Sequence, residues 1–201
     1  MLAFEPNLIS LVALLILLGA VLYTIHSLLN KGLIKIRLSE LFVYCGTLAL
    51  IGPFGEVVIN TFCRTVFGHS LWQYQVFPVH GGDTSLYSFF IWSIYYGFHL
   101  YLLHTKIDPT LTRKSNTFWG IVMALDALAL EALLNVASLL VFNTYIFFYF
   151  PPDLFHLTTI LVMPFYFIAG FAVVKTLRRF LKEPIFFGLM AFIISFTFLY
   201  I

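Results

Sequence analysis

Six long apolar stretches restrict this chain to the few folds that a lipid bilayer permits. They cover residues 8–29, 40–62, 85–104, 118–141, 157–177 and 184–201. About 20 apolar residues cross the hydrocarbon core as a helix, because every backbone N–H and C=O must be paired inside the protein there. The 201 residues are 61% hydrophobic and 10% charged, whereas a soluble domain carries roughly 25% charged residues. The sequence therefore predicts an all-α integral membrane protein with about six transmembrane helices in a single transmembrane domain.

The connections between these stretches differ sharply in charge. Ten of the eleven Lys and Arg residues lie in or beside the loops at 31–37, 106–114 and 175–182, and Arg64 is the exception. The positive-inside rule places these three loops in the cytoplasm, so both termini are expected on the non-cytoplasmic side. A net charge of +2 without a basic and aromatic patch argues against nucleic-acid binding.

The two long connections on the other side are aromatic and carry few charges. Residues 63–84 read "CRTVFGHSLWQYQVFPVHGGDT", and residues 142–156 read "FNTYIFFYFPPDLFH". Trp and Tyr prefer the membrane interface, so these segments are expected either to cap the outer half as a lid or to form a simple aromatic belt.

The same polar pattern occurs twice when the chain is shifted by 75 residues. "GEVVIN" at 55–60 then lies over "LEALLN" at 130–135 without a gap. Each copy would be a helix, an aromatic hairpin and a returning helix, over 40–104 and 118–177. Both copies begin on the predicted cytoplasmic side, so the sequence predicts a parallel internal repeat. The matched pairs are Glu56/Glu131, Asn60/Asn135, Val66/Val141, Phe67/Phe142 and Tyr74/Tyr149, with Trp72/Phe147 as a close replacement.

The repeated Glu and Asn place polar groups on one helix face within the membrane. Residues four apart share a face, while Asp126 is rotated by about 140° from Glu131 on the same helix. A carboxylate at the bilayer centre costs roughly 2.5–3.5 kcal/mol, so Glu56 and Glu131 are expected to be protonated and able to donate a proton. The alternative is that each Glu and Asn only joins neighbouring helices.

These residues and their aromatic neighbours form the predicted site. His80 in "PVHGGD" is included, although a histidine bonded to backbone at the interface explains it equally well. His99 and His104 are five apart and off a common face, so no metal and no cofactor is expected, and Cys45 and Cys63 are expected to be free thiols. The catalytic candidates are Glu56, Glu131 and Asp126; the substrate-binding candidates are Asn60, Asn135, Trp72, Tyr74, His80, Phe147 and Tyr149.

The hairpins resemble those of the lycopene cyclase domain family, small membrane proteins of carotenoid synthesis. "LWQYQVFP" at 71–78 and "IFFYFPPDLF" at 146–155 look like its hairpins, and "SLYSFF" at 85–90 and "MPFYFI" at 163–168 fall where its second element would come. The resemblance implies duplicated helical units and acid-driven chemistry on a polyene. The paired acids of the family are absent here, because Leu86–Tyr87 and Phe165–Tyr166 occupy about their places.

These features favour a cofactor-independent cyclase or isomerase that acts on an isoprenoid or other terpenoid-type membrane lipid. A carboxyl group would donate a proton to an alkene or epoxide, and aromatic faces would stabilise the resulting cation. A proton-coupled transporter or membrane substrate-binding subunit is the first alternative, favoured by a possible helix break at Gly52–Pro53. A membrane assembly protein without chemistry is the second.

Overall fold

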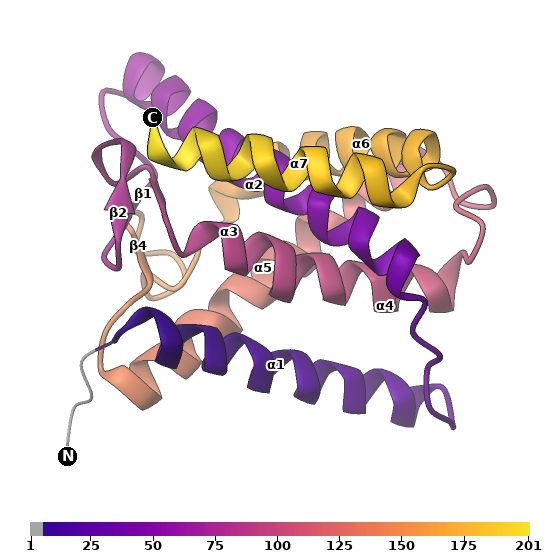
Figure 1. Ribbon diagram of the computed structural model, residues 1–201. Helices are drawn as coiled ribbons and strands as arrows, with labels where there is room; N and C mark the ends of the chain where they lie inside the picture. The colour runs from indigo at the N-terminus through magenta and orange to yellow at the C-terminus, as the bar shows by residue number, and fades with distance from the viewer. Residues whose placement is uncertain (1–5) are drawn as a thin grey trace.

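Helices account for most of the computed structural model, which describes residues 6–201 (Figure 1). Four helices in this part of the chain are long and apolar enough to cross a membrane: Leu8–Leu29, Leu38–Phe67, Asn116–Phe142 and Ile160–Phe180. The all-α prediction is therefore confirmed, and the protein is a membrane protein by the length and composition of its helices. The long helices are α1 (Leu8–Leu29), α2 (Leu38–Phe67), α5 (Asn116–Phe142), α6 (Met163–Phe180) and α7 (Pro184–Tyr200).

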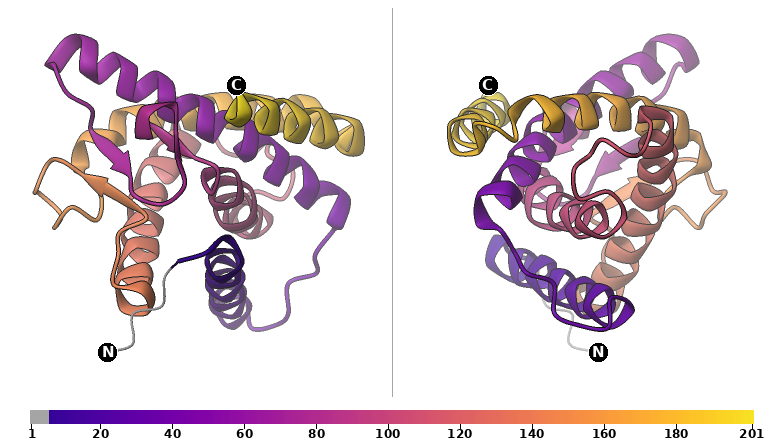
Figure 2. Two further views of the ribbon diagram at one scale, coloured as in Figure 1. Left: turned by 60° about the vertical axis from the view of Figure 1, so that its left-hand side comes forward. Right: turned by 90° about the vertical axis from the view of Figure 1, so that its right-hand side faces the viewer.

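A further helical segment runs through the middle of the bundle. It consists of α3 (Ser88–Phe90), a π-helix η2 (Ile91–Gly97) and α4 (Phe98–Ile107), which follow one another without a gap. Two views place it between α1 on one side and α6 and α7 on the other (Figures 1 and 2). The π-helix is the part of this segment that carries the buried Trp92, Tyr95 and Tyr96.

Glycines allow this segment to approach α2 closely. A Cβ on Gly97 would lie 2.8 Å from the Cα of Cys45, and one on Gly52 would overlap the ring of Trp92. Gly120 and Gly170 do the same for α5 and α6, where a Cβ on Gly170 would lie 2.8 Å from the Cα of Gly120. Small residues at such crossings let membrane helices pack by van der Waals contact, because lipid supplies little hydrophobic force between them.

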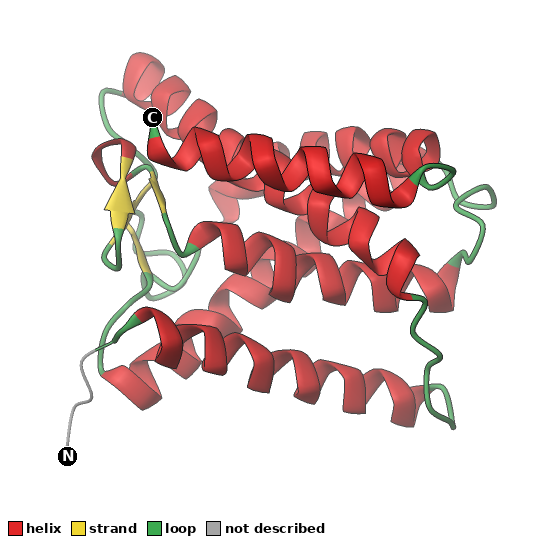
Figure 3. Ribbon diagram, in the orientation of Figure 1, coloured by secondary structure: helices red, strands yellow, loops and turns green. Residues whose placement is uncertain are grey.

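Short strands gather at one end of the helices, and the basic loops lie at the other end (Figures 1 and 3). Strands β1 (Trp72–Tyr74) and β4 (Phe147–Tyr149) pair antiparallel, with Gln73 opposite Phe148. Strand β2 (Pro78–Val79) pairs with β3 (Thr84–Ser85), and two 3₁₀ turns, η1 (His80–Gly82) and η3 (Ile160–Val162), complete the connections. The two aromatic connections are thus joined to each other through β1 and β4.

The helix boundaries differ from the sequence prediction at several places. Helix α2 continues to Phe67 and ends at Gly68, whose φ of 81° is the left-handed conformation of a glycine C-cap. The helix expected from residue 85 begins only at Ser88, because Thr84–Ser85 pair as a strand with Pro78–Val79. Similarly, α6 begins at Met163 after a 3₁₀ turn, six residues later than the expected start at residue 157.

The possible break at Gly52–Pro53 does not occur. Helix α2 is continuous through Pro53. A proline in a helix interior removes one backbone donor and so leaves a carbonyl group without its partner in the helix. Membrane helices tolerate this because neighbouring groups can satisfy the freed carbonyl. The two cysteines are free thiols, as predicted, with Cys63 buried and Cys45 partly buried.

Candidate functional site

Glu56 is the centre of a buried hydrogen-bond cluster on α2. Its side chain is 6% exposed. One oxygen, Oε1, accepts from the Tyr74 hydroxyl at 2.5 Å and from the Trp92 indole Nε1 at 2.8 Å. The other, Oε2, accepts from Ser88 Oγ at 2.7 Å and from the Thr84 hydroxyl. The donors come from the hairpin and from the returning helical segment, so Glu56 joins both to α2.

Glu131 has a corresponding cluster on α5. It is 4% exposed and accepts from the Tyr149 hydroxyl at 2.8 Å and from Thr158 Oγ1 at 2.6 Å. The Tyr166 hydroxyl of α6 is its third donor. As with Glu56, one tyrosine of the hairpin, one threonine at the hairpin's end and one aromatic residue of the next helix contact the carboxyl group.

The partner groups differ in what they reveal about the carboxyl groups. An ionised carboxylate accepts through both oxygens, whereas an indole N–H such as that of Trp92 can only donate. Hydrogen bonds to a charged group are roughly twice as strong as neutral ones, so they supply the compensation that a cation would otherwise give to a buried charge. Only the Trp92 contact fixes an acceptor, Oε1 of Glu56, because the hydroxyl groups around both residues can accept as well as donate. Protonation of Glu56 and Glu131 stays a prediction.

Asn60 and Asn135 attach the strands to the same two helices. Asn60 Oδ1 accepts from the backbone N–H of Leu71 at 2.9 Å, and its Nδ2 donates to the carbonyl of Trp72 at 3.0 Å. Asn135 repeats this with Ile146 at 3.0 Å and Phe147 at 2.9 Å. Both amides are fully buried, so each replaces solvent as the partner of strand backbone groups.

Aromatic contacts connect the two clusters. The rings of Trp72 and Tyr149 have centroids 5.7 Å apart, and those of Tyr74 and Phe147 are 5.5 Å apart. Below the strands, the Trp92 ring, which donates to Glu56, lies 6.0 Å from the ring of Tyr166. Trp92, a partner of Glu56, is thus in ring contact with Tyr166, a partner of Glu131.

A narrow slot lies beside Glu56. It encloses about 40 Å³, with Gly52, Gly55 and Glu56 of α2 on one side and Tyr166 of α6 on the other. Trp72 and Trp92 line it, and most of the remaining wall is aliphatic. An added Cβ on Gly55 would meet nothing within 4 Å, so this position borders open space.

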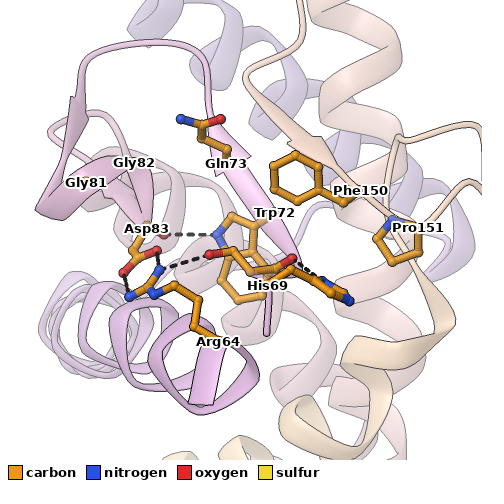
Figure 4. A pocket seen from close by; sticks show the side chains of 10 residues that line it. Arg64, His69, Trp72, Gln73, Gly81, Gly82, Asp83, Phe150 and Pro151 are labelled. Carbon is orange, nitrogen blue, oxygen red and sulfur yellow. Dashed lines mark hydrogen bonds and ion pairs between the residues drawn. The ribbon is translucent and has the colours of Figure 1, made fainter. Parts of the chain in front are cut away.

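A larger pocket lies above the slot at the hairpin end (Figure 4). It encloses about 610 Å³. Arg64 at its edge pairs with Asp83, with Nη2 to Oδ2 at 2.6 Å, and donates to Ser70 Oγ at 2.9 Å. Trp72 lines this pocket as well as the slot.

Two of the predicted site residues lie outside these clusters. Asp126 Oδ1 contacts Nε2 of His99 on α4 at 2.8 Å, and the His99 ring lies 5.1 Å from that of His26 on α1. His80 stacks on Phe198 of α7 and contacts its carbonyl oxygen at 3.0 Å. Neither contacts Glu56 or Glu131 through a hydrogen bond. His80 is therefore bonded to a backbone group, which is the alternative to a role for this histidine in the site.

Sequence reasoning missed the serine, threonine and indole donors. Thr84 and Thr158 have the same role but are 74 residues apart, one fewer than the 75-residue shift, so an alignment without gaps pairs Thr84 with Thr159 instead. A one-residue gap in that alignment could have found them. The missed residues are Thr84, Ser88, Trp92, Thr158 and Tyr166, together with the Arg64–Asp83 pair.

Among residues 6–201, no three or more His, Cys, Asp or Glu side chains gather closely enough to hold a metal ion. Comparison of the chain with protein-family models, with curated proteins and with solved structures finds no match. Functional inference for this protein therefore rests on its own geometry and chemistry.

Proposed function

We propose that this protein is a membrane-embedded, cofactor-independent isomerase or cyclase that acts on an isoprenoid or other terpenoid-type lipid. The observation that carries the proposal is a narrow apolar slot that is lined by Glu56 of α2 and Tyr166 of α6. A lipid would reach this space sideways from the bilayer, between α2 and α6.

The proposal includes a six-span topology. α7 and the segment Ser88–Ile107 would cross the membrane beside the four longer helices, with the basic loops in the cytoplasm and both termini on the other side. The two units, 40–104 and 118–177, would be copies of one ancestral helix–hairpin–helix unit. Their matched Glu, Asn and Tyr contacts support this.

Glu56 and Tyr166 would supply opposite halves of a proton shift. The Glu56 carboxylate would remove a proton from one carbon of the lipid, and the Tyr166 hydroxyl would deliver a proton to another carbon, which moves the double bond between them. Glu131, which shares a hydrogen bond with the Tyr166 hydroxyl, would be protonated at rest and would pass its proton to the Tyr166 oxygen as Tyr166 gives up its own. Exchange with water would then remove the proton from Glu56 and restore one to Glu131. One proton leaves the lipid and one enters it, so the step needs no oxidant, reductant or metal.

The position of Tyr166 also fits the resemblance to the lycopene cyclase domain family. Tyr166 lies about where that family's acid is expected, and it donates to a carboxyl group from the first helix of its own unit. A tyrosine paired with Glu131 would then replace an acid on the returning helix. Trp72 and Trp92 would face the substrate and stabilise positive charge that develops on it.

The size of the slot limits how a substrate binds. A volume of about 40 Å³ holds little more than one water molecule, whose share of liquid is roughly 30 Å³. A prenyl chain would therefore lie along the open side at Gly55 and present only its reacting double bond to Glu56.

Deuterium exchange into extracted lipids tests the chemistry for any substrate of this class. The protein, purified in lipid nanodiscs from its host membrane, is incubated in D₂O, and the extracted lipids are analysed by mass spectrometry. We expect carbon-bound deuterium in one lipid class with the wild type and none with Glu56→Gln. Tyr166→Phe should lose about a hundredfold or more in rate, the range for a single general acid–base group.

Substitutions at Gly55 and Val58 provide the matched control. Gly55→Phe fills the open side of the slot and should abolish exchange, whereas Val58→Phe on the exposed face of the same helix should not. Wild-type protein that leaves every lipid unlabelled, or Glu56→Gln with full exchange, would overturn the proposal.

A membrane assembly protein is the second candidate, favoured by the number of donors on each carboxyl group. Glu56 and Glu131 have four and three donors, which suffices to explain them as joints between helices and hairpins. In that case Glu56→Gln would lower thermal stability, and no lipid would exchange deuterium even with the wild type.

A further inference from the structure

We propose that the pocket at the hairpin end binds the uncharged polar head of a lipid whose chain lies along the open side of the slot beside Glu56. This inference rests on the proposed function, because it identifies the class of the lipid used there. The head would be a hydroxyl or carbonyl group, and not a phosphate or a carboxylate.

Trp72 borders both the pocket and the slot, and it is 4% exposed. Its indole Nε1 donates to the carbonyl of Asp83 at 3.0 Å, and its own carbonyl accepts from Asn60. Trp72 is thus held in place where it borders both spaces, which suits an amphiphile that extends from one to the other.

The charges of the pocket compensate each other. Arg64 contacts both oxygens of Asp83, which is 3% exposed, so its guanidinium group is already occupied by a carboxylate. Planar two-point pairs of this kind are among the strong hydrogen-bonded contacts in proteins. A phosphate would have to compete with Asp83 for Arg64 and would meet repulsion from that carboxylate. The residues that line the pocket include no other Lys, Arg, Asp or Glu.

The remaining polar groups fit a neutral head. The exposed carboxamide of Gln73 can both donate and accept (Figure 4). On the opposite side, His69 Nδ1 donates to the Ser70 carbonyl at 3.0 Å, which leaves Nε2 of a neutral imidazole as an acceptor. A Cβ on Gly82 would lie 2.9 Å from Cγ of Gln73, so the glycine leaves room for this side chain. Phe150 and Pro151 supply an apolar side, which suits the first carbons next to a hydroxyl or carbonyl group.

Three probes that share one prenyl chain distinguish the possible heads. Binding of tritiated geranylgeraniol to the protein in nanodiscs is measured in competition with unlabelled geranylgeraniol, geranylgeranyl diphosphate and the hydrocarbon that has the same unsaturated chain without the hydroxyl group. We expect the alcohol to compete at least about tenfold better than either of the others, since one or two well-placed hydrogen bonds are worth about that factor. A diphosphate that competes equally well or better would overturn the inference.

Two glutamines of the same hairpin give a matched pair of variants. Gln73→Ala removes a pocket side chain and should weaken alcohol binding by about threefold or more. Gln75→Ala removes an exposed side chain that does not line the pocket and should leave binding unchanged. Both positions are exposed, so neither variant disturbs the core. Equal affinity in the two variants would overturn the inference.

Glu56→Gln separates this inference from the proposed chemistry. It should keep the preference for the alcohol while it loses deuterium exchange. Selective alcohol binding without any exchange by the wild type would contradict the chemistry alone. The head-group site alone would be contradicted if deuterium exchange depended on Glu56 but was unaffected by Gln73→Ala, and if the alcohol bound no better than the other probes.

Discussion

Gln73 of β1 lies opposite Phe148 of β4, and the two residues are 75 positions apart, the same shift that relates Glu56 to Glu131. The neighbouring pairs are Trp72 with Tyr149 and Tyr74 with Phe147. Trp72 is 75 positions before Phe147, and Tyr74 is 75 positions before Tyr149. The repeat shift therefore converts the pair Trp72–Tyr149 into the pair Phe147–Tyr74, and the two strands exchange places. This register supports the internal repeat that we propose, whose two-fold axis would pass between Gln73 and Phe148.

Removal of either buried asparagine should destabilise the protein. Asn60→Leu and Asn135→Leu each leave a strand N–H and a carbonyl without a partner, at roughly 1–3 kcal/mol for each unpaired group. We expect lower melting temperatures in detergent, followed by intrinsic tryptophan fluorescence. Asn143→Gly is the control: this exposed residue has a φ of 54°, which glycine adopts freely. Asparagine variants that melt with the control would contradict the assigned role.

Gly52→Ala should be harmful and Gly55→Ala harmless. The Cβ at position 52 overlaps the ring of Trp92, whereas the one at position 55 meets nothing within 4 Å. Overpacking costs about 1–3 kcal/mol, and displacement of Trp92 would also remove a donor from Glu56. Unfolding of both variants in a detergent series checks this, and equal stabilities would contradict the predicted contact.

Asp108 should make stability depend on acidic pH. It lies in the loop after α4, where burial opposes its charge but the backbone N–H groups of Lys114 and Arg113 hold the carboxylate. These hydrogen bonds outweigh the effect of burial and lower the pKa of Asp108 below its ordinary value. Its contribution is therefore present above the unfolded-state pKa of about 3.9 and is lost as pH falls through the lower folded-state pKa.

The comparison of wild type with Asp108→Asn measures that contribution. We expect the wild type to be more stable at pH 7 and the difference to shrink as the pH approaches 3. A difference that is constant over this range would mean that ionisation of Asp108 has no effect on stability.

Cysteine labelling should distinguish six crossings from four. In a background of Cys45→Ala and Cys63→Ser, single cysteines at the exposed Thr112 and Gln75 lie at opposite ends of the helices. We expect an impermeant maleimide to label Gln75→Cys from outside intact cells and Thr112→Cys only after lysis. The reverse pattern would mean that the topology is inverted. Labelling of both cysteines from outside would place them on the same side, which would mean that the segment Ser88–Ile107 does not cross the membrane.

Sequence reasoning reached the helices and the polar helix faces because both depend on local patterns. Long apolar runs specify membrane helices almost regardless of context. The four-residue spacing likewise placed Glu56 and Asn60 on one face, where both are buried. Prediction of helix ends was less accurate at Ser88 and Met163, where strand pairing and a 3₁₀ turn replace the first expected turns.

The partners of the carboxyl groups were out of reach because they depend on tertiary packing. Trp92 reaches Glu56 from a π-helix, and such a segment has no sequence period that distinguishes it from an α-helix. Asp126 shares a helix with Glu131 but bonds to His99, since its rotation about the helix turns it to another neighbour. The strands are three residues or shorter, and their pairing with each other follows from where the helices hold them.

The order of contacts along the chain bears on how the protein is made. Each acceptor helix, α2 or α5, precedes the hairpin whose hydroxyl and backbone groups it binds. Synthesis runs from the N-terminus, so Glu56 and Asn60 leave the ribosome before Tyr74 does. The first hairpin can then close at once, and its strand β1 is in place as the template on which β4 aligns when the second unit arrives.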